Sequence, residues 1–258
     1  MVMNNMEIPR LERDFRVHVY DTSADEKLSL CSLFNYMQDV AAEHAIKLGY
    51  GRDELMKGNH FWVLSRMYAE IREWPFRDET ILVRTWPYGT EGVFALRFYE
   101  VRYPDGRLIA SASSSWLIID ATTRKIQRPD EKLSVYNSLK EKEAFLVRTA
   151  GKLDDQLRDG ELSPEFRVKP SDLDVNLHTN NVNYLKWTID AYDFDFMMKH
   201  VPSSVEINYL AESMLGENII IRSSREAGNG LFYRHSIFRT TDSRELCRIR
   251  LEWKEHKN

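Results

Sequence analysis

The feature that most restricts the fold of this chain is an internal repeat. Residues 79–84 are similar to residues 217–222, and residues 92–94 are similar to residues 230–232. Both matches have the same offset, since 217 − 79 and 230 − 92 are each 138. A constant offset across separate matches is typical of a duplication. A third match, of Asn35-Tyr36-Met37 with Asn183-Tyr184-Leu185, links two expected helices. The alternative is chance similarity between strands of like composition.

The order of the expected elements repeats as well. Each half shows a strand, a polar loop, a long helix with one apolar stripe, and then four strands. In the first half we expect a strand at 15–20, a helix from Leu30 to Leu48 ended by Gly49, and strands at 61–71, 80–86, 93–103 and 108–119. In the second half we expect a strand at 166–168, a helix at 183–199, and strands at 205–209, 218–223, 231–239 and 246–253.

This order predicts an α+β architecture, in which a helix packs on the antiparallel sheet that follows it. One such unit alone leaves a sheet edge exposed. Two units that pair edge to edge give one continuous sheet with both helices on the same side. The segment from Arg128 to about Gly160 is rich in charges and is interpreted as a connector.

Composition excludes several classes of function. The 258 residues are 43% hydrophobic and 29% charged with a net charge of −4, so the balance is that of a soluble globular protein without a general reason to bind nucleic acid. Cys31 and Cys247 form no disulfide framework, which suits a reducing cytoplasm. The first 14 residues lack the apolar region of a secretory signal, and no apolar run of about 20 residues predicts membrane insertion. No metal-ligand spacing and no glycine-rich phosphate loop occurs, so we expect no cofactor and no metal.

One polar stretch concentrates the chemistry. Asp174, Asn176 and His178 form an Asp-x-Asn-x-His pattern directly before an expected helix start. Thr179, Asn180 and Asn181 follow as N-cap candidates, because their side-chain oxygens can accept from the free N–H groups of a first helical turn. An imidazole with a pKa near 6.5 beside a carboxylate is suited to proton transfer at neutral pH. The alternative is a loop whose polar side chains only cap the helix.

This stretch resembles the catalytic loop and helix start of the acyl-acyl carrier protein (acyl-ACP) thioesterases of plants and bacteria. The similarity extends from about residue 15 to about residue 253, and the chain is identified as a bacterial-type member. The positions that carry it are Asp174, Asn176, His178, the Asn180-Asn181 pair and Tyr184, together with the strands at 62–67 and 112–116 and the turn Thr123-Arg124-Lys125.

The resemblance implies a tandem hotdog fold. It implies an N-terminal hotdog at residues 1–130 that binds the acyl chain, a connector at 131–160, and a catalytic C-terminal hotdog at 161–258. It also implies that Glu212, at the end of an expected strand, is an active-site residue. A subset of the apolar stripe of the first helix would line the acyl pocket, although ordinary core packing is the alternative for each of its members: Leu33, Phe34, Met37 and Ala41.

The implied reaction is hydrolysis of the fatty acyl-ACP thioester to free fatty acid and carrier protein, which terminates fatty acid synthesis. Many plant members carry cysteine after the glutamate, whereas this chain has Ser213. We therefore expect water as the nucleophile, deprotonated by His178 and Glu212. Asn176 would position water or the carbonyl, and Asp174 would hold its neighbours or share the role of base.

Three alternatives remain open at this stage: an acyl-CoA thioesterase, a hotdog hydratase or dehydratase, and a non-catalytic acyl-binding module. The expected partner is an acyl carrier protein, and a homodimer is left open. Because carrier proteins are acidic, we expect a basic docking patch, with plain solvated surface as the alternative for each candidate. The candidates are Arg66, Arg97, Arg102, Lys186 and Arg234.

Overall fold

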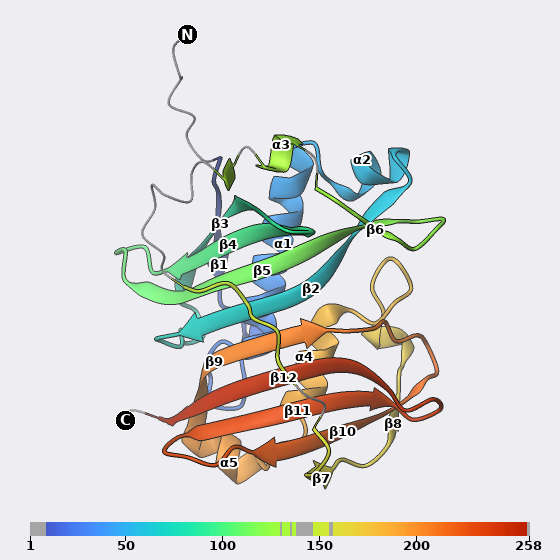
Figure 1. Cartoon of the computed structure of the whole chain (residues 1–258). Coiled ribbons are helices and arrows are strands. Elements are labelled where there is room, and N and C mark those ends of the chain that lie inside the picture. The colour runs from blue at the N-terminus through green and yellow to red at the C-terminus, as the bar shows by residue number, and fades with distance from the viewer. Residues whose placement is uncertain (1–8, 130, 135, 138–146, 155–156, 257–258) are drawn as a thin grey trace.

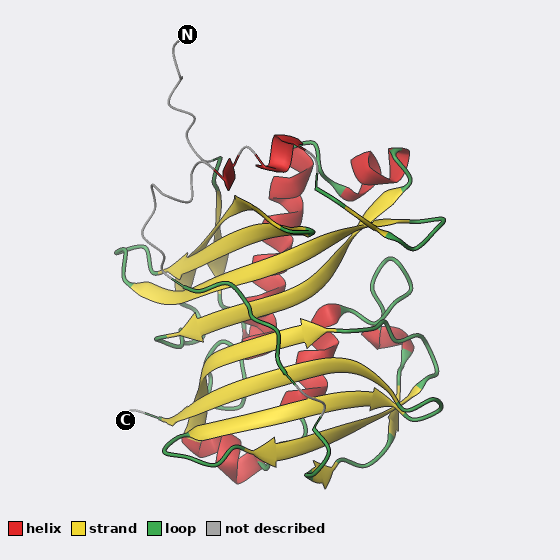
Figure 2. Cartoon of the chain, in the orientation of Figure 1, coloured by secondary structure: helices red, strands yellow, loops and turns green. Residues whose placement is uncertain are grey.

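The computed structural model describes residues 9–129, 131–134, 136–137, 147–154 and 157–256. One broad antiparallel sheet runs through the molecule, and the long helices lie behind it (Figures 1 and 2). This arrangement confirms the predicted α+β class.

The first half contains one long helix and its sheet. Its elements are β1 (Leu11–Arg16), a 3₁₀ turn (Val19–Asp21), α1 (Leu30–Lys47), α2 (Arg52–Lys57), β2 (His60–Ile71), β3 (Thr80–Glu91), β4 (Phe94–Arg102), β5 (Leu108–Asp120), β6 (Ile126–Gln127) and α3 (Glu131–Ser134). The first strand begins earlier than the predicted 15–20. The strand also ends before residue 20, because a 3₁₀ turn occupies Val19–Asp21, where the Asp21 carboxylate accepts from the His18 N–H (3.1 Å).

The second half repeats this order. Its elements are β7 (Glu161–Leu162), β8 (Phe166–Arg167), a 3₁₀ turn (Pro170–Asp172), α4 (Asn181–Ile189), α5 (Phe194–Lys199), β9 (His200–Tyr209), β10 (Asn218–Arg225), β11 (Leu231–Arg239) and β12 (Arg244–Glu255). The prediction of one helix over 183–199 was wrong. The Asp193 carboxylate accepts from the N–H groups of Asp195 (2.9 Å) and Phe196 (3.2 Å), so a second helix begins there.

The two half-sheets join at β2 and β9. The strand order is β1-β3-β4-β5-β2-β9-β12-β11-β10-β7, with β8 also paired to β10 and β6 to β5. Tyr68 on β2 pairs with Glu206 on β9, and 206 − 68 is again 138. Equivalent residues of the two repeats therefore face each other at the junction, as a pseudo-twofold axis requires. The predicted continuous sheet is confirmed.

The helices follow a different offset from the strands. The N-caps are Ser29 and Asn180, which are 151 residues apart (180 − 29). Asn183 therefore corresponds to Ser32, and the predicted match between Asn35 and Asn183 was wrong. The first half has 50 residues from the start of α1 to the start of β3 (80 − 30), against 37 in the second half (218 − 181). Much of the difference lies in α1, which has 18 residues where α4 has 9.

The core lies between the helices and the sheet. The apolar stripe of α1 is almost fully buried, as Leu33, Phe34 and Met37 show, and Leu185 contributes from α4. The α1 and α4 helices also contact each other, so both halves share one apolar core. Burial of this continuous surface is the main term that stabilises the tandem arrangement.

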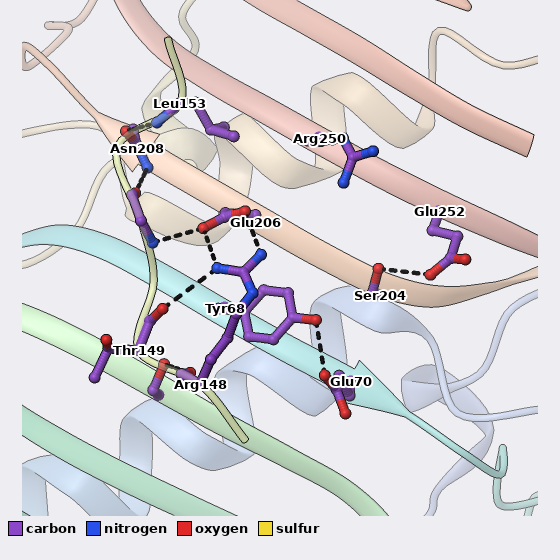
Figure 3. A network of polar contacts seen from close by, with 12 residues as sticks. Tyr68, Glu70, Arg148, Thr149, Leu153, Ser204, Glu206, Asn208, Arg250 and Glu252 are labelled. Carbon is purple, nitrogen blue, oxygen red and sulfur yellow. Dashed lines mark hydrogen bonds and ion pairs between the residues drawn. The ribbon is translucent and has the colours of Figure 1, made fainter. Parts of the chain in front are cut away.

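A segment of the predicted connector crosses the face of the sheet opposite the helices (Figure 1). Figure 3 shows its contacts at the junction, where the Arg148 guanidinium donates to both carboxylate oxygens of Glu206 (2.7 and 2.6 Å). The same guanidinium lies 3.7 Å from the ring centroid of Tyr68. Asn208 donates to the Gly151 carbonyl (3.0 Å) and accepts from the Leu153 N–H (2.8 Å). Residues 148–153 therefore tie β2 and β9 together at the pseudo-twofold axis.

Candidate active site

The predicted catalytic loop is a tight turn between the Pro170–Asp172 turn and α4. Its centre is Asp174, whose Oδ1 accepts from the N–H groups of Asn176 (2.8 Å) and His178 (3.2 Å). Leu177 adopts the left-handed conformation (φ 63°), and its N–H donates to the Asp174 carbonyl (3.0 Å). Asx turns of this kind use a short carboxylate to hold a backbone that no regular element would stabilise.

The loop leads directly into the N-terminus of α4. The Asn180 side chain accepts from the Val182 N–H (3.0 Å), so Asn180 is the N-cap among the three predicted candidates. The Asn183 side chain donates back to the Asp172 carbonyl (2.8 Å), which fixes the loop against the helix. His178 therefore lies two residues before the N-cap, near the positive end of the helix dipole.

His178 faces Glu212, which lies beyond the end of β9. The imidazole Nδ1 is 3.6 Å from Glu212 Oε1, and the two side chains are 26% and 35% exposed, so water reaches both. Arg124, which follows β5, donates from Nη2 to the other oxygen, Glu212 Oε2 (2.8 Å). Arg124 therefore holds the carboxylate so that Oε1 faces the imidazole.

Asn176 is held from the first half of the chain. Arg52, the first residue of α2, donates from Nε to Asn176 Oδ1 (3.1 Å). The Asn176 Nδ2 lies 3.4 Å from Asp174 Oδ2. The amide nitrogen has two N–H groups, so while one donates to Asp174 Oδ2 the other can donate to a substrate.

The structure thus brings together all four predicted catalytic residues. Asp174 contacts Asn176 and the backbone of His178, and His178 contacts Glu212. Arg52 is a partner that sequence reasoning did not find, and Arg124 appeared only within a family-like turn. Each is far in sequence from the residue that it holds, at separations of 124 and 88 residues, so no local pattern identifies them.

Ser213 has a structural environment. It is fully buried, and its hydroxyl donates to Thr179 Oγ1 (2.7 Å) and lies 2.9 Å from the Tyr184 hydroxyl. The Tyr184 hydroxyl in turn accepts from the Ser213 N–H (3.0 Å). These bonds tie the end of the Glu212 loop to α4.

The two cysteines are unsuited to nucleophilic attack. Burial raises the pKa of the Cys31 thiol to about 12, and burial raises the pKa of Cys247 well above its usual value. Both are free thiols. Since the thiolate is the reactive form, both side chains are inert near neutral pH.

The remaining predicted site residues have mixed surroundings. Leu33, Phe34, Met37 and Ala41 are buried in the main core along α1. Arg97 does not lie on open surface as the docking prediction requires, because its guanidinium is half-buried and bonds His44 Nδ1 (3.1 Å) and Thr85 Oγ1 (3.2 Å). Among the described residues, no group of three or more His, Cys, Asp or Glu is placed to hold a metal ion.

Comparison with known proteins defines the family. The model of the acyl-ACP thioesterase N-terminal domain matches residues 10–136, and that of the C-terminal domain matches residues 156–255. The chain belongs to the acyl-ACP thioesterase family. Among the residues that the structure describes, no helix is long and apolar enough to cross a membrane.

Individual relatives agree with this assignment. The palmitoyl-acyl carrier protein thioesterase of Arabidopsis thaliana is 28% identical over 93% of this chain, which spans 63% of that relative's length. An acyl-ACP thioesterase from Bacteroides thetaiotaomicron superposes with a TM-score of 0.86 at 23% identity, covering 95% of this chain and 98% of that one. The 12:0-ACP thioesterase from Umbellularia californica superposes with a TM-score of 0.80 at 21% identity, covering 96% of this chain and 94% of that one. The predicted tandem hotdog fold is confirmed.

Proposed function

We propose that this protein hydrolyses the thioester of fatty acyl-ACP, releasing free fatty acid and carrier protein and so terminating fatty acid synthesis. The observation that carries the proposal is the solvent-reached His178–Glu212 pair at the start of α4, in a chain of the acyl-ACP thioesterase family. The names of the related proteins give the substrate class, since the Arabidopsis thaliana relative is named for palmitoyl-ACP.

In the proposed mechanism, His178 is the general base. Glu212 faces Nδ1 of the imidazole and favours the tautomer with its proton there, so Nε2 accepts the proton of the attacking water. The water oxygen bonds to the thioester carbon, and the carbonyl oxygen becomes the oxyanion of a tetrahedral intermediate. Collapse breaks the carbon–sulfur bond, and the departing sulfur takes the proton from His178, which leaves the acid and the thiol.

The other two residues serve this step in different ways. Asp174 already accepts from two backbone N–H groups, so its role is to hold the loop rather than to act as a second base. The Asn176 amide nitrogen, oriented through Arg52, is suited to donate to the carbonyl oxygen as charge develops on it. The positive end of the α4 dipole acts in the same direction.

The proposal assigns the remaining functions to the rest of the chain. Residues 1–130 would hold the acyl chain, with Leu33, Phe34, Met37 and Ala41 as candidate pocket residues, 131–160 would connect the halves, and 161–258 would carry the chemistry. The acyl carrier protein is the proposed partner. The two free cysteines support a reducing location such as the cytoplasm. A homodimer stays a prediction.

The test is release of free thiol from a panel of acyl-ACP and acyl-CoA thioesters of several chain lengths. We expect turnover of acyl-ACP with kcat/KM well above that for the matching acyl-CoA. Equal or better turnover of acyl-CoA would contradict the assigned partner. Binding of acyl-ACP without any thiol release would contradict the proposed hydrolysis and favour an acyl-binding module.

A further inference from the structure

The catalytic loop has a structural copy in the first half of the chain. Residues 21–29 correspond to residues 172–180 at the offset of 151 that separates the two N-caps. The Ser23 N–H donates to the Lys27 carbonyl (2.8 Å), as the Asp174 N–H does to the His178 carbonyl (2.8 Å). Glu26 adopts the left-handed backbone conformation (φ 62°), as Leu177 does at the corresponding position (φ 63°). Lys27 therefore occupies the position of His178, and Asp25 that of Asn176.

The elements around the copy also correspond, but their chemistry differs. Leu28 N–H donates to Pro75 O (2.8 Å), as Thr179 N–H does to Ser213 O (3.0 Å), so Trp74 occupies the position of Glu212. The α5 helix corresponds to α2, and its first residue is Phe194, whereas the first residue of α2 is Arg52. The glutamate and the arginine of the catalytic site are thus replaced by aromatic side chains, and the copy lacks the general base.

A pocket is present at this copy. It encloses about 90 Å³, several times the roughly 10–15 Å³ that one water needs. Its lining is mainly apolar and includes Trp74, Phe194, Met197, Met198 and Trp253. Phe194 and Met198 line the pocket and are nevertheless 63% and 40% exposed, so the apolar surface continues outward from the mouth.

A cation stands at the polar end of the pocket. Lys27 Nζ lies 2.5 Å from His256 Nδ1 and forms a longer ion pair with Asp25 Oδ2 at 3.8 Å, beyond hydrogen-bond distance. All three side chains are 16–17% exposed. Burial and the neighbouring Lys27 lower the pKa of His256, so its Nδ1 accepts from the ammonium. An ammonium has three N–H donors, and a carboxylate in the pocket can accept from it.

We propose that this pocket binds the carboxylate of a free fatty acid, with Lys27 at its head group and the apolar lining of α5 and Trp253 along its chain. The proposal deepens the proposed function, because the product of that reaction is the same class of molecule. Since lysine stands at the position of the general base His178 and tryptophan at that of Glu212, the site binds without hydrolysis. The site is separate from the proposed catalytic loop.

The test is photo-crosslinking of the full chain with a dodecanoate that carries a diazirine in its alkyl chain, followed by peptide mapping. We expect labels on α5 or on Trp253, and at least a fivefold loss of these labels in Lys27→Met. Lys57→Met, on the equivalent helix of the other half, is the matched control and should label as wild type does. Met197→Trp fills the pocket while keeping Lys27 and should abolish the same labels.

Two results would overturn the site. One is labelling confined to the catalytic loop and Glu212, and the other is labelling of α5 that Lys27→Met and Met197→Trp leave unchanged. If Lys27→Met melts early, Met197→Trp still decides the matter. The readout does not require turnover, so loss of this site is distinguishable from failure of the proposed hydrolysis. Thiol release from acyl-ACP without added fatty acid should be unchanged in Lys27→Met.

Discussion

Replacement of Ser213 by alanine separates a structural serine from a nucleophilic one. In the structure Ser213 is fully buried, and its hydroxyl bonds to Thr179 and Tyr184 at 2.7 and 2.9 Å. Ser213→Ala therefore removes two buried hydrogen bonds and leaves both partners without this contact. With water as the nucleophile, the variant should be less stable but still active.

The size of the effect follows from those contacts. A net contribution of about 1 kcal/mol for each buried hydrogen bond gives a loss of about 2 kcal/mol in the free energy of unfolding. For a chain of this size, each kcal/mol lost lowers the melting temperature by about 2–4 °C, so the midpoint of thermal unfolding should fall by about 4–8 °C. Loss of a true serine nucleophile would instead lower kcat by on the order of 10⁶ with little change in stability.

The assay combines a thermal melt with thiol release from acyl-ACP well below the midpoint, and with intact-mass spectra taken during turnover. Tyr184→Phe is the matched control, because it removes the partner hydroxyl of the same network and should be destabilised similarly. A loss of kcat above a thousandfold in folded Ser213→Ala would refute the reasoning, as would an acyl adduct on Ser213 in wild-type protein.

Three further predictions concern other parts of the molecule. Arg124→Ala should lower kcat by about tenfold or more with a smaller change in KM, since Arg124 orients Glu212 rather than binding the acyl chain, and Arg124→Lys should recover part of the loss. Met37→Trp or Ala41→Trp should shift the acyl-length profile toward short chains if these residues line the acyl pocket; a loss of stability of about 1–3 kcal/mol with an unchanged profile would assign them to the core. Burial, and then Arg97, lowers the pKa of His44 to about 4. As the pH falls, the unfolded chain therefore binds a proton at this histidine at a higher pH than the folded chain does. The unfolding free energy should therefore fall by up to about 1.4 kcal/mol per pH unit between pH 6.5 and 4, and His44→Gln should flatten this dependence in urea titrations, whereas equal slopes would contradict the assignment.

The sequence predicted the parts of the fold that depend on periodicity. The stripe of Leu33, Phe34 and Met37 defines α1, and alternation defines the long strands, because burial on one face imposes these patterns directly. The break between α4 and α5 was missed, since it depends on one capping carboxylate, Asp193, within an otherwise helical run.

The proposed catalytic loop could be predicted for a similar reason, because its hydrogen bonds are local and centre on Asp174. The contacts of Arg52 and Arg124 could not be predicted, because they form only when the two halves pack against each other. The copy of the loop at Lys27 was hidden as well. Its offset of 151 differs from the 138 of the strands, since the first half has 13 more residues between the helix start and β3 (50 − 37).

The measurement that tests the central claim most directly is a double-mutant cycle on kcat with acyl-ACP, using His178→Ala, Glu212→Gln and the double variant. If the pair activates one water, each single change should lower kcat by on the order of 10²–10⁴. The double variant should then be little worse than the weaker single variant, because both residues serve the same proton transfer. Losses that multiply across the cycle, or a folded single variant with near wild-type kcat, would contradict the shared role of His178 and Glu212.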